Sequence, residues 1–154
     1  MTYIKAEKKA EATRFLNERL AIARKQLKPD SLELGVELAF NGKTLLELSE
    51  FADAQGLLQE SLLIREQLEP QAWTTFSAKA LLGVALLGQK NFAEAEPLML
   101  AGFEGMKQRE TTIPPAAKVR IPETIDSLIE LYTALGKTES VEKWQVERAN
   151  YKNN

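Results

Sequence analysis

The eight residues FADAQGLL, from Phe51 to Leu58, return 41 positions later as FAEAEPLM, from Phe92 to Met99. A related stretch, KAEATRFL, lies 42 positions before the first copy, from Lys9 to Leu16. Self-similarity at a fixed period of about 20–50 residues is typical of repeat proteins, in which each supersecondary unit stacks on the next. The sequence therefore predicts a repeat solenoid, a class whose usual role is to present a surface to another protein.

Apolar residues recur at three- and four-residue steps almost throughout the chain, which is typical of amphipathic helices. This pattern is interrupted at Pro29, at Gly88 and at the stretch 111–115, where proline or glycine ends a helix. Pro70 suits the first turn of a helix, because its missing N–H is not needed there. We expect no strand and about seven helices, at 3–27, 31–48, 51–68, 70–88, 92–107, from near Pro122 to Gly136, and from about 138 to the C-terminus.

The predicted helices alternate between two types. First-type helices carry a glycine followed by paired leucines, as in GKTLL from Gly42 to Leu46 and GVALL from Gly83 to Leu87. Second-type helices carry the repeated Ala-x-Ala phrase. Because glycine has no Cβ, we expect these two glycines to let Ala54 and Ala95 of the facing helices approach closely, with large apolar residues beside them.

We therefore expect an all-α fold, a right-handed α-solenoid of antiparallel helix pairs, in a single domain over residues 1–154. Its expected parts are a second-type helix at 3–27, repeats at 31–68 and 70–107, and a closing repeat at 115–151. No first-type helix precedes the first helix, so the chain begins inside a repeat. Either it is a piece of a longer array or residues 3–27 act as a cap.

The composition excludes several classes of function. The 154 residues carry a formal net charge of −2, whereas general nucleic-acid binding needs a concentrated basic surface, so no nucleic-acid partner is expected. The chain has no Cys and no His, which removes the thiolate, the commonest general base and the commonest transition-metal ligand. We expect no enzyme activity, no metal and no cofactor. No apolar run reaches the roughly 20 residues of a membrane helix, so membrane insertion is not expected; the compartment stays open, with the cytoplasm favoured.

The order of these motifs resembles the tetratricopeptide repeat (TPR). The period of about 42 residues and the Ala-Glu-Pro-Leu phrase at 95–98 resemble its longer, kinesin-light-chain variety. Further segments resemble the C-terminal repeat region of certain bacterial serine/threonine protein kinases, at Trp73–Phe76, Leu82–Lys90, Gly102–Lys107 and Leu131–Lys137. Kinase activity itself is not implied, because the chain has no glycine-rich phosphate loop, no His-Arg-Asp motif and no Asp-Phe-Gly motif.

In TPR proteins the first-type helices line a concave groove. By phase, the resemblance implies that this groove presents Val36, Ala39, Lys43, Leu46, Ser77, Ala80 and Val84. Peptide-binding members often grip a terminal carboxylate with Asn, Lys or Arg at such positions, and here only Lys43 remains. We therefore expect a mostly apolar groove that suits a helix or an apolar side chain rather than a carboxylate clamp. The alternative is that these residues simply pack against a neighbouring helix.

The resemblance implies a protein–protein interaction or scaffold module that binds a protein or peptide. The expected context is the docking or regulatory region of a larger signalling protein such as a bacterial serine/threonine kinase. The alternative is a structural spacer, or an element that self-associates through its N-terminal half-repeat. Two smaller features stay open: four cations form either a basic patch for an acidic partner or a solvated surface, and Trp73 serves either as a partner anchor or as an inter-repeat contact. These cations are Lys107, Arg109, Lys118 and Arg120.

Overall fold

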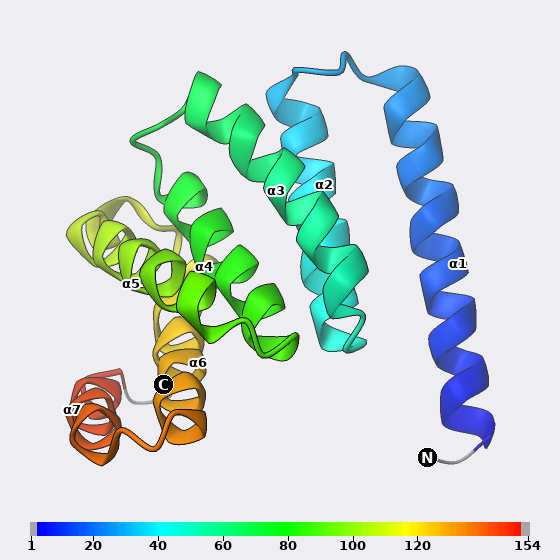
Figure 1. Ribbon diagram of the computed structural model, residues 1–154. Helices are drawn as coiled ribbons and strands as arrows, with labels where there is room; N and C mark the ends of the chain where they lie inside the picture. Colours follow the sequence, from blue (N-terminus) through cyan, green and yellow to red (C-terminus); the bar gives the residue numbers. More distant parts are fainter. Residues whose placement is uncertain (1–2, 152–154) are drawn as a thin grey trace.

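The computed structural model describes residues 3–151, and side chains from residue 6 onward. This part of the chain contains no strand and is built from helices (Figure 1). The α-helices are α1 (Tyr3–Gln26), α2 (Leu32–Glu47), α3 (Phe51–Leu68), α4 (Trp73–Gly88), α5 (Phe92–Gln108), α6 (Arg120–Ala134) and α7 (Thr138–Ala149). Two short 3-10 turns, η1 (Glu110–Thr112) and η2 (Pro115–Ala117), join α5 to α6. The predicted all-α solenoid is confirmed.

The helices form the antiparallel pairs α2–α3, α4–α5 and α6–α7, which stack along the chain, while α1 lies beside the first pair (Figure 1). Successive helices alternate in direction, so the first-type helices α2, α4 and α6 all run in the same direction (Figure 1). The second-type helices α3, α5 and α7 run in the opposite direction. This parallel arrangement of the first-type helices determines the polarity of the candidate site described below.

Two helix starts test the boundary predictions. Ser31 caps α2, since its hydroxyl oxygen accepts the Leu34 N–H at 3.2 Å, and the helix begins one residue after the expected start at 31. The prediction that α4 begins at Pro70 is wrong, because α4 begins at Trp73. Hydrogen bonds from the Ala72 N–H and the Thr75 hydroxyl to the Glu69 carbonyl, at 3.0 and 2.7 Å, close a separate turn first.

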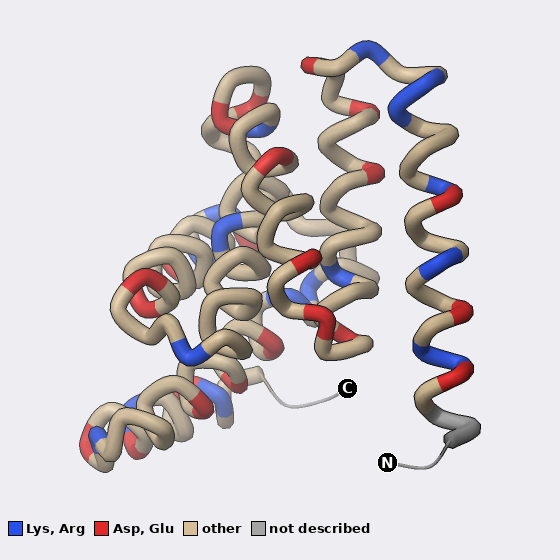
Figure 2. Tube along the Cα trace, turned by 45° about the vertical axis from the view of Figure 1, so that its right-hand side comes forward, with Lys and Arg blue, Asp and Glu red and all other residues tan. Residues whose placement is uncertain are grey.

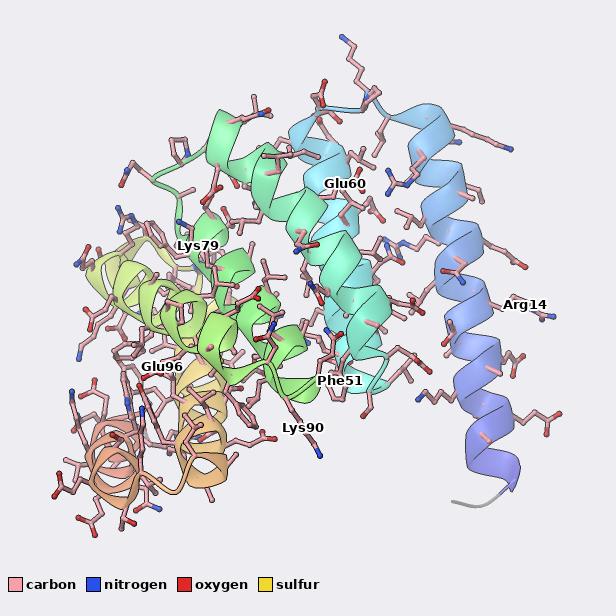
Figure 3. All side chains as sticks on the ribbon, viewed as in Figure 1. Arg14, Phe51, Glu60, Lys79, Lys90 and Glu96 are labelled. Carbon is pink, nitrogen blue, oxygen red and sulfur yellow. The ribbon has the colours of Figure 1, made fainter. Side chains whose placement is uncertain are left out.

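The predicted close packing at glycine is confirmed. A Cβ placed on Gly83 would lie 2.4 Å from Met99 Cγ and 3.1 Å from the Ala95 carbonyl oxygen, and one placed on Gly42 would lie 2.7 Å from Leu58 Cγ. Such distances are shorter than van der Waals contact, so α4 and α5 approach more closely than any larger residue would permit. Close packing at a glycine also occurs between pairs, where the Phe51 ring at the start of α3 fills the space beside Gly88 at the end of α4 (Figure 3).

The core extends from one pair to the next, as expected of a stacked repeat. At its C-terminal end the rings of Phe103 and Trp144 meet edge to face, with centroids 4.9 Å apart. Nearby, the Tyr132 hydroxyl donates a hydrogen bond of 2.7 Å to the Glu96 carboxylate. Burial and this hydrogen bond together raise the pKa of Tyr132 to about 12. These contacts join the closing pair α6–α7 to α5.

Candidate binding groove

Side chains of α2, α4 and α6 enclose two adjoining cavities, each of about 220 Å³. The cavities share Lys43, Ser77, Leu81 and Arg120 in their linings, so they form one continuous depression across the three first-type helices. We call it the α2–α4–α6 groove. Trp73 lines one of the two cavities, and we call this cavity the Trp73 end of the groove. Glu123 lines the other cavity, which we call the Glu123 end.

All seven residues that the repeat phase implied line this groove. At the Trp73 end lie Val36 and Ala39, and at the Glu123 end lie Leu46, Ala80 and Val84, while Lys43 and Ser77 line both ends. The first-type helices bring these positions together because successive turns present the same helix face to the groove. Their role in binding stays a prediction.

The groove is mostly apolar, with an exposed apolar edge and a buried floor. Val36 and Phe40 on α2 are each 49% exposed and form part of the edge at the Trp73 end. Ser77 and Ala80 on α4 are buried, so they form the floor and offer little contact area. Trp73 is half-buried, packs against the core and also lines the groove, which is consistent with both interpretations of this residue.

The sequence analysis does not assign the groove-lining residues of α6. Arg120, Glu123, Thr124 and Ser127 all line the Glu123 end, and Arg120 also lines the Trp73 end. The repeat phase was extended over only two repeats, so the corresponding face of the closing repeat was not assigned. A constant offset of 41 from Ser77, Ala80 and Val84 does not identify them, because the long connection between α5 and α6 breaks the register: that offset gives Lys118, Ile121 and Ile125, and both isoleucines are fully buried.

Of the two alternatives for the four cations, a basic patch is not favoured by the structure, because three of them have separate partners. Lys107 pairs with Glu147 at 2.5 Å, and Arg120 pairs with Glu123 at 2.9 Å. The Arg109 guanidinium lies 4.3 Å from the centre of the Phe76 ring, where cation–π attraction holds it. Figure 2 shows both signs of charge distributed over the molecule, although α4 carries only one charged residue, Lys79.

The cations that line the groove are held by acidic residues three or four positions further along the chain. Lys43 forms an ion pair with Glu47 one turn later on α2, as Arg120 does with Glu123 on α6. Arg65 reaches the Trp73 end from α3 and is only 5% exposed; its guanidinium pairs with Glu69, while its Nε has no partner among the described residues. Side chains fixed in this way present their charges at defined positions.

Within residues 3–151, no group of three or more acidic side chains is arranged to hold a metal ion. Glu94 and Glu96 are two apart on α5, so they do not face each other. Glu96 instead accepts the Tyr132 hydroxyl. No helix in this described part is long and apolar enough to cross a membrane.

The fold and the groove together define a TPR-like α-solenoid. Among solved structures, the chain is similar to BtubC (BKLC) from P. vanneervenii, with a TM-score of 0.69 and 16% identity, covering 96% of this chain and 61% of that one. It is also similar to a Podosopora anserina protein described as a kinesin light chain with nearly identical TPR-like repeats, with a TM-score of 0.71 and 16% identity, covering 99% and 72%.

The chain therefore spans about 61% of the length of the BtubC chain that it matches. No protein-family model matches the chain, and no curated protein matches it. Identities near 16% show a shared fold and leave function to be argued from the site itself.

Proposed function

We propose that this chain is a protein–protein interaction or scaffold module that binds a peptide or helix of a partner protein in the α2–α4–α6 groove. The observation that supports the proposal best is the groove itself, since three helices from three successive pairs contribute to one continuous apolar depression. Ligand sites are typically concave and mostly apolar, with a few fixed polar groups, which matches this arrangement.

The wider context that we propose is the docking or regulatory region of a larger signalling protein, such as a bacterial serine/threonine kinase. It rests on the segments that resemble the repeat region of such kinases, which include Trp73–Phe76 at one end of the groove. In this role the chain supplies binding and positioning, and any catalytic step belongs to another domain.

The experiment is a capture of partners from the lysate of the source cell, quantified by mass spectrometry. Two groove variants, Lys43→Glu and Val84→Glu, are compared with the parent and with Ala101→Glu, a matched charge insertion at an exposed position of the outer helix α5. We expect a partner that the parent and the α5 control retain and that both groove variants lose, with all four proteins folded by circular dichroism. A partner retained by the folded groove variants would contradict the proposal.

A second candidate function, self-association, is supported by the outer face of α1. Phe15 and Ile22 lie seven residues apart and are 63% and 55% exposed. Ile64 is the residue of α3 in register with Ile22, and it is only 4% exposed because it packs against α2 near Gly35. In α3 this helix face packs against the paired helix α2. The corresponding face of α1 is therefore exposed. Arg14 lies on the side of α1 that points away from the other helices (Figure 3).

Sedimentation equilibrium tests this alternative. If α1 mediates association, the mass of the parent rises with concentration, and Phe15→Glu with Ile22→Glu returns it to the monomer value. A constant monomer mass over the whole range excludes self-association through α1 and leaves a monomeric binding module.

A further inference from the structure

Charge is distributed unequally between the two ends of the groove. The charged side chains that line the Trp73 end are Lys43, Arg65 and Arg120, and no Asp or Glu lines it. The lining of the Glu123 end adds two carboxylates, Glu47 and Glu123, to the shared cations. The groove therefore changes along its length from a purely cationic lining to a mixed one.

This order follows from the direction of the helices. On α2 the acid Glu47 comes four residues after Lys43, and on α6 the acid Glu123 comes three residues after Arg120. Because α2 and α6 run in the same direction, both ion pairs have the cation nearer the Trp73 end and the carboxylate nearer the Glu123 end. The two pairs reinforce each other as parallel dipoles.

The peptide dipoles of the three helices act in the same sense. An α-helix carries roughly half a positive charge at its N-terminus and half a negative charge at its C-terminus. Trp73 and Thr74, the first two residues of α4, line only the Trp73 end, whereas Arg120, the first residue of α6, lines both ends. Side-chain charges and the N-terminus of α4 therefore both make the Trp73 end attractive to a negative group.

The size of the groove limits what it can hold. It follows α2 from Val36 to Glu47, a span of about 16 Å at the helical rise of 1.5 Å per residue. That length accommodates about three turns of a bound helix, or about five residues of an extended peptide. Leu81 lines both ends and Val84 lies next to it at the Glu123 end, and this apolar lining suits an apolar middle part of such a segment.

We propose, on the basis of the proposed function, that the groove binds a partner segment of fixed polarity. The segment has an acidic end, an apolar middle and a basic end. Its acidic end lies at the Trp73 end, against Lys43, Arg65 and Arg120, and its basic end lies against Glu47 and Glu123. Complementary charges of this kind fix the register and exclude wrong partners more than they add affinity.

Three synthetic peptides test the charge order by fluorescence anisotropy. They share an apolar middle and differ only at their ends: EELAALAKK, EELAALAEE and KKLAALAKK. We expect EELAALAKK to bind at least about fivefold more tightly than the other two at low salt, and this difference to shrink as salt screens the charges. Equal binding of all three would overturn this inference and leave the groove proposal standing, whereas no binding by any of them would overturn both.

A charge-reversed protein provides the control. In Glu47→Lys with Glu123→Lys the whole groove is lined by cations, so we expect the preference to move from EELAALAKK to EELAALAEE. A merely structural role of the two carboxylates would weaken all three peptides alike and would not reverse their order. An unchanged order of affinities would therefore contradict the inference.

Disulfide trapping tests the orientation directly, because the chain contains no Cys. Val36→Cys places a thiol at the exposed edge of the Trp73 end, and Ser127→Cys places one at the Glu123 end. The peptide cysteine is supplied as a mixed disulfide with thionitrobenzoate, so that the protein thiolate displaces thionitrobenzoate by exchange. We expect such a peptide with its cysteine beside its two glutamates to react faster with Val36→Cys. The matched peptide, with its cysteine beside the two lysines, should react faster with Ser127→Cys. Reversed or equal rates would overturn the proposed polarity.

Discussion

Replacement of Gly102 by alanine tests the packing that holds the solenoid together. Gly102 lies in α5, and a Cβ at this position would lie 2.7 Å from the Ala80 Cβ and 2.8 Å from the carbonyl oxygen of Phe76. Two of the three nearest atoms belong to the backbone of α4, so they cannot rotate away as the end of a long side chain could. Gly102→Ala therefore requires α4 and α5 to separate.

The expected magnitude follows from two opposing effects. Alanine in place of glycine favours a helix by about 1 kcal/mol. Overpacking typically costs about 1–3 kcal/mol, and contacts on rigid backbone place this site at or above the upper limit. We therefore expect a net destabilisation of about 2 kcal/mol, which lowers the melting temperature of a chain of this size by roughly 4–8 °C.

Gly56→Ala is the matched control, because it makes the same chemical change inside α3 with no atom within 4 Å of the new Cβ. Here only the helix preference acts, so the melting temperature should rise by about 2–4 °C. Both variants are measured by thermal unfolding followed by circular dichroism. A Gly102→Ala protein that melts at or above the parent would refute the claim that close helix approach at this glycine is required.

Three further predictions concern the packing of α4 against α5, the ion pair that joins α1 to α3, and the hydrogen bond between Tyr132 and Glu96. Gly83→Leu inserts a longer side chain between α4 and α5, and we expect a loss of several kcal/mol, near the limit of about 3 kcal/mol typical of overpacking, measured by urea unfolding. Two hydrogen bonds from Arg24 lower the pKa of Glu60, so this pair stabilises the fold above the usual Glu value of about 4.3 and loses that contribution as the pH falls. The melting temperature should therefore fall more on acidification in the parent than in Arg24→Ala; parallel curves would show that the pair contributes nothing. Because the pKa of Tyr132 is raised to about 12, this side chain should stay protonated above pH 10 in a spectrophotometric titration, and Glu96→Gln should lower its pKa.

The repeat and its packing were predictable because they depend on local sequence. The Ala-x-Ala phrase recurs at a near-constant offset, and both the helix period and the positions of proline and glycine are properties of short segments. The close approach at Gly83 was predictable for the same reason, since a glycine in register with another glycine indicates a constraint on packing. These local properties identified the seven helices and the faces that pack together.

The start of α4 was not predictable from local preference. Pro70 is favourable in the first turn of a helix, yet hydrogen bonds to the Glu69 carbonyl close a separate turn before Trp73. The role of Arg120 was missed for a different reason. It follows a proline-rich connection and was grouped with nearby cations, whereas the stacking of the third pair places it in the groove.

The sequence by itself determined that this chain is an all-α repeat protein, which helices pair, and which faces of α2 and α4 share a phase, because periodicity records all three. Only the tertiary structure decided how the pairs stack, and therefore that α6 completes the groove with Arg120 and Glu123. It also decided that the two ion pairs are parallel, so that the groove has a cationic end. Stacking brings together residues about 80 positions apart, and no local pattern encodes the direction in which their charges add.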